Sequence, residues 1–241
     1  MKQPAFKKDP LGAAFYDYYF NHQYHAKVKT ISDHGGMDSM PVSMFFRTYR
    51  EMGKLEQKAL KACKGSVLDI GAGAGCHALW LQENNHPVTA IDVSRGAVSV
   101  MKERGIKDAR EISFFKLNEK PYDTVFMMMN GIGFTGDPEG LEKFFEHVKT
   151  LMQDDSKIIL DSTDVSYLYS EHGPNLEIDL TSSYYGVFDF MMEYNGIFSD
   201  PFYWMYIDYA SLAALAEENG FKVEKIYQDE SFRYLARLRM K

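Results

Sequence analysis

Three glycines alternate in the stretch 71–75, and an acid, Asp69, stands two residues before the first of them. Glycine has no Cβ, so the backbone of such a stretch can approach a ligand closely. Residues 67–70 read as a buried strand and residues 76–83 as a helix, whose free N–H groups would face the turn. Strand, glycine turn and helix together predict a nucleotide-binding corner. The residues expected to line it are Gly71, Ala72, Gly73 and Gly75.

A second acid, Asp92, ends the next predicted strand, 88–91, and lies twenty-one residues after Gly71. A carboxylate at this place can accept hydrogen bonds from both ribose hydroxyls of a nucleotide. Asp69 discriminates between nucleotides, because a carboxylate beside the turn repels a pyrophosphate but suits a ligand with an ammonium and a sulfonium group. The dinucleotide fingerprint also requires a third glycine where this chain has Cys76.

With these residues the chain resembles the class I S-adenosylmethionine-dependent methyltransferases. Residues 69–75 match the first motif of that family and residues 90–94 match its second. The resemblance covers residues 65–160 well and the C-terminal strands loosely. It implies S-adenosyl-L-methionine as cofactor, with Asp92 holding the ribose, Val93 flanking the adenine, and Asp69 orienting the amino acid part. It also implies a seven-stranded sheet whose last strand is antiparallel.

Two further places are expected to contact the cofactor. A third strand is predicted near 112–115, where the family often has an acid that binds the adenine amino group; this chain has Ser113, with the backbone N–H of Phe114 as an alternative donor. The fourth predicted strand, 122–130, ends at Asn130 and Gly131, which we expect at the carboxyl edge of the sheet, facing the glycine turn. No Asn-Pro-Pro-Tyr-type motif follows, which argues against methylation of DNA bases or protein glutamine.

The alternation of strands and helices predicts an α/β fold with a doubly wound, mostly parallel sheet. Residues 63–241 would form the methyltransferase domain, with a fifth strand at 157–161 and final strands at 221–226 and 232–240. Residues 1–62 would form an N-terminal helical cap or lid, including a helix over 42–63. An aromatic-rich β insertion at about 165–208 either packs on the sheet or forms one wall of the acceptor pocket.

Residues outside the motifs leave several roles open. Arg47 and Tyr49 precede the glycine turn and either reach the methionine carboxylate of the cofactor or lie on an exposed helix face. The sequence does not rank the candidate general bases, so no catalytic residue is assigned. The candidates are His22, His25, His172 and Glu193.

Composition limits the function classes. The chain has 241 residues and a net charge of −7, which argues against a nucleic acid partner. Two cysteines form no disulfide framework, the histidines show no metal-ligand spacing, and no apolar run is long enough to span a membrane. These features favour a cytoplasmic protein.

The sequence therefore predicts methyl transfer to the O, N or C nucleophile of a small molecule. The aromatic and apolar insertion favours a small organic acceptor over a charged polymer. Two alternatives remain at this point: a nicotinamide-dependent oxidoreductase, and a non-catalytic module that binds S-adenosylmethionine. The sequence leaves the acceptor and the oligomeric state open.

Overall fold

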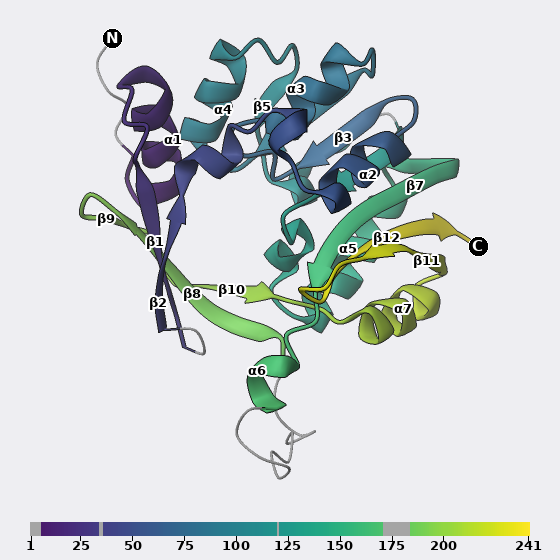
Figure 1. The fold of residues 1–241 in the computed structure, drawn as a ribbon. Helices are drawn as coiled ribbons and strands as arrows, with labels where there is room; N and C mark the ends of the chain where they lie inside the picture. The colour runs from purple at the N-terminus through teal and green to yellow at the C-terminus, as the bar shows by residue number, and fades with distance from the viewer. Residues whose placement is uncertain (1–5, 34–35, 120, 171–183) are drawn as a thin grey trace.

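The structure is a computed structural model that describes residues 6–33, 36–119, 121–170 and 184–241. Figure 1 shows two layers of strands: a large sheet sandwiched between helices, and a smaller antiparallel sheet built beside it. No helix in the described ranges is long and apolar enough to cross a bilayer.

The main sheet has seven strands in the order β11-β12-β7-β6-β3-β4-β5. From the centre to one edge run β3 (Val67–Ile70), β4 (Val88–Asp92) and β5 (Ala109–Glu111). Toward the other edge run β6 (Tyr122–Met127), β7 (Met152–Thr163), β12 (Arg233–Met240) and β11 (Phe221–Gln228). The strands from β5 to β7 pair in parallel, and β12 is antiparallel to both of its neighbours. The predicted doubly wound, mostly parallel sheet with an antiparallel last strand is confirmed.

Helices cover both faces of this sheet. Neighbouring residues of β3 alternate between the two apolar cores, with Val67 in one and Leu68 in the other, as a strand buried on both faces requires. The first core receives α2 (Lys54–Ala62), α3 (Cys76–Glu83) and α4 (Arg95–Glu103). The second receives α5 (Pro138–Lys149) and α7 (Tyr209–Glu218).

The second sheet joins the N-terminal segment to the insertion. Its strands are β1 (Lys27–Ser32), β2 (Gly36–Pro41), β8 (Val187–Tyr194), β9 (Ile197–Phe198) and β10 (Phe202–Met205). β8 is central, pairing with β1 so that Lys29 stands opposite Glu193. Asn195 and Gly196 form the turn that connects β8 to β9. α1 (Pro10–Phe20) packs between this sheet and α4, and a short α6 (Tyr167–Ser170) follows β7. The strands β1 and β2 were not predicted.

The predicted third strand at 112–115 is wrong. The strand is β5, at Ala109–Glu111, and a 3-10 turn, η3 (Phe114–Lys116), follows it. Phe114 is buried with its ring 5.1 Å from that of Phe144, so this apolar run fills the core at the end of the sheet instead of extending it.

The helix predicted over 42–63, with a possible break at Gly53, is wrong before Gly53 and correct after it. The segment forms two 3-10 turns, η1 (Val42–Phe45) and η2 (Tyr49–Glu51), before α2 begins. The Glu51 side chain accepts the Thr48 N–H at 2.7 Å, so Thr48 is the capped residue that starts η2. Gly53 is extended, with φ −66° and ψ 163°, and is the residue before α2.

Candidate cofactor site

The glycine turn connects β3 to α3. Gly71, Gly73 and Gly75 have φ of 69°, 56° and 82°, a left-handed conformation that side chains disfavour. A Cβ on Gly75 would overlap Ile106, whereas one on Gly71 would meet nothing within 4 Å. The N–H of Ala72 donates to Ile91 O at 3.1 Å and ties the turn to β4. The turn is therefore packed on its inner side and open beside Gly71, where a ligand can approach its backbone.

Asp92 ends β4 and faces the same turn. Its Oδ2 accepts the Gly73 N–H at 2.9 Å and its Oδ1 accepts the Ser94 N–H at 2.8 Å. Burial raises the pKa of Asp92, and these backbone hydrogen bonds oppose that rise. The next residue, Val93, is 73% exposed, unusual for a valine, and offers an apolar surface beside the carboxylate. An acid next to an exposed apolar side chain suits a ribose and its base.

Asp69 lies in β3 and is 2% exposed. Its Oδ2 is buried and has no hydrogen-bond partner among the described residues. Burial raises the pKa of Asp69 to about 6, a rise that His77 opposes and Asp92 supports. A buried carboxylate oxygen without a donor costs free energy, which accounts for the raised pKa of this group.

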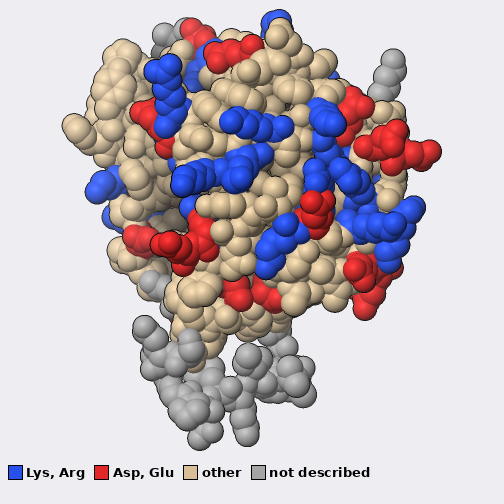
Figure 2. Space-filling model, turned by 45° about the vertical axis from the view of Figure 1, so that its right-hand side comes forward, with Lys and Arg blue, Asp and Glu red and all other residues tan. Residues whose placement is uncertain are grey.

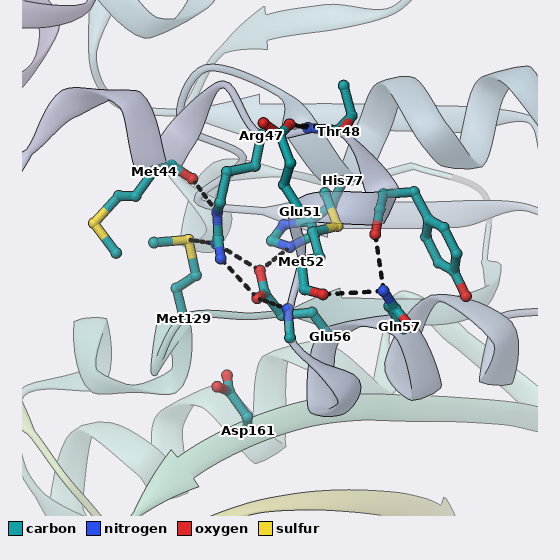
Figure 3. A network of polar contacts seen from close by, with 12 residues as sticks. Met44, Arg47, Thr48, Glu51, Met52, Glu56, Gln57, His77, Met129 and Asp161 are labelled. Carbon is teal, nitrogen blue, oxygen red and sulfur yellow. Dashed lines mark hydrogen bonds and ion pairs between the residues drawn. The ribbon is translucent and has the colours of Figure 1, made fainter.

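Figure 3 shows a buried ionic cluster that sequence reasoning missed, built on Glu56 of α2. The Arg47 guanidinium binds both Glu56 oxygens, at 2.7 and 3.0 Å, and also donates from Nε to Met44 O at 2.7 Å. His77 Nε2 lies 3.0 Å from Glu56 Oε1. Arg47 is therefore not on an exposed helix face: it lies between η1 and η2, with its side chain 23% exposed.

The charges of this cluster support one another. Burial alone would raise the pKa of Glu56, but His77 and Arg47 bring it below its usual value. Burial alone would lower the pKa of His77, but Cys76, Glu56 and Asp69 raise it well above its ordinary value. Glu56 is thus ionised and His77 protonated at neutral pH. The sequence feature that could have indicated this cluster is His77, which follows the glycine turn closely. Nothing in the local sequence pairs His77 with Glu56, which lies 21 residues earlier.

Asn130 and Gly131 follow β6 at the carboxyl edge of the sheet. A Cβ on Gly131 would lie 4.0 Å from Ile70 O, which brings this position beside the end of β3, as predicted. Asn130 has a left-handed φ of 57°, and its side chain is fully engaged: Oδ1 accepts from Ser162 at 2.7 Å and Nδ2 donates to Met205 O at 3.2 Å. The Asn130 carbonyl is engaged as well, because it accepts the Gly133 N–H at 3.0 Å.

Asp161 of β7 holds the Asn130 backbone in place. Its Oδ1 accepts the Asn130 N–H at 2.9 Å, and burial raises its pKa to about 7. Ser113 lies at the opposite side of the site, directly before η3 and partly exposed. The residue before it, Ile112, donates to Asp92 O at 3.0 Å, which places Ser113 near the acid expected to bind the ribose.

Comparisons with known proteins agree with this geometry. A family model described as a methyltransferase domain matches residues 67–155. A solved S-adenosylmethionine-dependent methyltransferase from Bacteroides fragilis, in complex with S-adenosyl-L-homocysteine, is 43% identical; the match covers 99% of this chain and 97% of that one, with a TM-score of 0.87. The chain belongs to the S-adenosylmethionine-dependent methyltransferases.

More distant structures share the fold of this methyltransferase. The CcbJ methyltransferase from Streptomyces caelestis is 14% identical, over 81% of this chain and 99% of that one, with a TM-score of 0.61. The sugar N-methyltransferase KedS8 from Streptoalloteichus sp. is 11% identical, over 80% and 91%, with a TM-score of 0.52. No curated protein matched significantly. Family membership leaves no support for the nicotinamide-dependent alternative.

The candidate general bases of this methyltransferase make other contacts. His22 Nδ1 lies 3.0 Å from the Tyr24 hydroxyl, and His25 is exposed beyond it. Glu193 binds Lys29 at 2.8 Å in the second sheet. Within the described part of the chain, none of the three contacts the glycine turn, and His172 lies outside the described residues. No general base is assigned.

Proposed function

We propose that this methyltransferase transfers a methyl group from S-adenosyl-L-methionine to a nucleophilic O, N or C atom of a small organic acceptor. The observation that supports this proposal is an aromatic face of the second sheet. That face lies between the glycine turn and the end of β6, where a methyl donor held by the turn would be reached.

We assign the residues of the methyl-donor site from the acids and the open backbone at the ends of the first strands of the main sheet. Asp92 accepts hydrogen bonds from the ribose hydroxyls, and Val93 packs against the adenine, near Ser113 and the Phe114 backbone. The unpartnered Oδ2 of Asp69 accepts from the ammonium of the donor. Arg47 is the cation that can bind the carboxylate of the methyl donor, and its guanidinium then forms hydrogen bonds both to that carboxylate and to Glu56. Gly71, Ala72, Gly73 and Gly75 contact the donor through their backbone, and the backbone of Asn130 and Gly131 closes the edge.

The acceptor wall is the inner face of β8 and β10, defined here by Phe190, Phe202, Trp204 and Tyr206. All four are partly exposed, and the ring of Phe202 lies 6.1 Å from those of Phe190 and Trp204. Phe202 pairs with Phe190 in the sheet, so these rings share one face.

Both ends of the acceptor wall are attached to the donor domain. At one end Trp204 packs so closely on Gly133, just after Gly131, that a Cβ there would overlap the indole. At the other end the Tyr194 hydroxyl donates to Asp17 of α1 at 3.0 Å, and the α1 ring of Phe15 lies against Gly73. The wall thus spans from β6 to the glycine turn.

We propose that residues 1–62 and the insertion at 165–208 act together as a lid over the domain formed by the rest of residues 63–241.

The chemistry needs little from the protein beyond placement. The sulfonium of the bound donor activates its methyl group, so the side chains must align an acceptor nucleophile behind it and exclude water. The aromatic rings can stack on an apolar acceptor body and hold it at one distance from the turn. A base is needed only for an acceptor that keeps its proton at neutral pH.

The test is a screen for S-adenosyl-L-homocysteine production with small amine, hydroxyl and carbon acceptors. Once an acceptor is found, Trp204→Ala and Phe190→Ala are expected to raise its KM at least tenfold while leaving S-adenosyl-L-homocysteine affinity unchanged. Phe198→Ala, which removes a 49% exposed ring of β9, is the matched control. Methylation of a protein or nucleic acid with no small acceptor turned over, or a KM unaffected by both wall variants, would refute the proposal.

A further inference from the structure

We propose a second ligand site at the amino end of the main sheet, which binds a phosphate group through Lys157, Arg239, Lys222 and Lys64. We call this set the cation row. It lies on the face of the sheet that α2 covers, at the opposite end of the strands from the glycine turn.

The strand register places the row in line. Arg237 stands opposite Ile159 and Leu238 opposite Ile158, so the next step of the antiparallel register brings Arg239 opposite Lys157. Arg239 in turn stands opposite Lys222 of β11. Residues directly opposite each other across strands point to the same face, so three cations follow one another across three neighbouring strands.

The fourth cation is attached on the other side of Lys157. Thr124 of β6 pairs with Lys157, and its hydroxyl donates to Lys64 O at 2.8 Å and accepts the Lys64 N–H at 3.1 Å. Lys64 is therefore held one strand away from Lys157, just before β3. Burial lowers the pKa of Lys157, and Lys64, Arg237 and Arg239 lower it further, while Cys63 opposes them. Apart from Asp123, whose pKa Lys157 lowers, the charged groups around this ammonium are thus other cations.

One acid, Asp123, lies near enough to Lys157 for the ammonium to lower the pKa of its carboxyl, but no acid among the described residues is bonded to the row. In the described ranges, no hydrogen bond or ion pair joins the side chain of any of its four members to a carboxylate. The nearest acids have other partners: Glu224 binds Arg237 at 2.6 Å, and Asp123 accepts from Ser66 at 2.7 Å and from Gln153 at 2.8 Å. Figure 2 brings this side of the molecule forward and shows Lys and Arg side chains gathered over it, although the chain carries a net charge of −7.

Lys157 is the feature that points to a ligand. The residue is 5% exposed and its ammonium lies among other cations, and like charges directly opposite each other in a sheet cost free energy. A dianion placed between Lys157 and its neighbours removes this cost. The site also has the donors that oxyanions use, two kinds of ammonium and a guanidinium fork.

The size of the row selects a small ligand. Neighbouring strands lie about 4.8 Å apart, so Lys157, Arg239 and Lys222 span roughly 10 Å, about the extent of one or two phosphate groups. A nucleic acid backbone would lie across the exposed cations Arg239 and Lys222 and gain little from Lys157, a residue that is only 5% exposed. The structure thus favours inorganic phosphate or the phosphate of a small ester over a polymer.

The experiment is isothermal titration calorimetry of the whole protein with inorganic phosphate at pH 7.5, with ionic strength held constant by chloride. We expect saturable binding that Lys157→Met weakens at least tenfold and Arg239→Gln, at an exposed position, weakens about fivefold. Lys102→Gln, which removes an exposed cation from α4, is the matched control and should bind phosphate as the wild type does. Circular dichroism checks that each variant is folded.

Three results would overturn the proposal. Phosphate could bind no better than chloride, or Arg239→Gln and Lys157→Met could both bind it as tightly as the wild type. Alternatively, a short RNA could bind far more tightly than phosphate and remain insensitive to Lys157→Met, which would make this face a polymer surface instead. Titration with glycerol phosphate beside inorganic phosphate distinguishes a monoester ligand from the free ion.

Discussion

The two ends of the main sheet differ in the sign of their charged residues and in whether these residues form ion pairs. At the carboxyl end, the buried acid Glu56 is bound by Arg47, His77 and a backbone N–H. At the amino end, the buried Lys157 stands among cations, and no acid within the described residues binds it. Removing one partner of a buried ion pair leaves the other charge uncompensated and destabilises the fold, whereas removing one of several neighbouring like charges relieves repulsion.

Asp69 combines both conditions at the carboxyl end. It faces the positive charge of His77, yet its Oδ2 has no donor among the described residues. The comparison therefore predicts which substitutions damage the fold and which damage only binding. Glu56 belongs to the first group, and Asp92, Asp69 and Lys157 belong mainly to the second, Asp92 and Asp69 for the methyl donor and Lys157 for phosphate.

The largest effect on stability is expected for Glu56→Gln. Removing this charge leaves Arg47 and His77 as buried cations without a counter-ion, a loss of about 3 kcal/mol in the free energy of unfolding. Urea denaturation at pH 7.5 measures it. Glu51→Gln, at the nearby exposed cap of η2, is the control and should cost much less. A Glu56 variant as stable as the Glu51 variant would mean that the cluster is not stabilising.

The next effect concerns binding. Asp92→Ala removes the carboxylate expected to accept both ribose hydroxyls, and two charge-assisted hydrogen bonds correspond to about a hundredfold in affinity. Calorimetric titration with S-adenosyl-L-homocysteine measures it. Asp108→Ala, an acid of the next loop that binds Arg110 at 2.6 Å, should leave the affinity unchanged. Equal affinities for the two variants would remove Asp92 from the donor site.

The parts of this molecule that sequence reasoning found are those encoded locally. The glycine turn and Asp92 could be predicted because their spacing is fixed by one strand, one turn and one helix. The second sheet could not, since Lys29 and Glu193 pair across more than 160 residues and only the folded chain sets their register. The Glu56–His77 pair was missed for the same reason, because α2 and α3 must first pack together.

The pH dependence of donor binding tests Asp69. Its pKa is about 6 in the free protein, so below that pH the carboxyl is protonated and cannot accept from a donor ammonium as an anion. The affinity for S-adenosyl-L-homocysteine should therefore rise about tenfold per pH unit up to pH 6 and level off above it. Calorimetry between pH 5 and 8 shows this, and Asp69→Asn should abolish the slope.

The free energy of unfolding should change with pH in the opposite direction to the affinity for S-adenosyl-L-homocysteine. A carboxyl whose folded pKa exceeds its unfolded value makes the fold less stable as pH rises from about 4 to about 6. Asp69→Asn is thus expected to raise the Tm at pH 7.5 while weakening donor binding. A variant with a lowered Tm and unchanged affinity would show that Asp69 serves the fold and not the ligand.

The smallest effect is expected at the amino end. Lys157→Met keeps the length of the side chain but removes a buried charge that faces other cations, so in phosphate-free buffer it should stabilise the protein by about 1 kcal/mol. The sign follows from the lowered pKa of Lys157, because the folded protein disfavours its charged form. The wild type should accordingly gain stability as pH rises toward the unfolded lysine value of about 10.4, and the variant should lack that gain. Thermal melts of both proteins between pH 7 and 10 measure this. A Lys157→Met variant with a lowered Tm would mean that the ammonium already has a stabilising partner, for which Asp123, whose pKa Lys157 lowers, is the candidate. The contrast between the two ends of the sheet would then be one of sign alone.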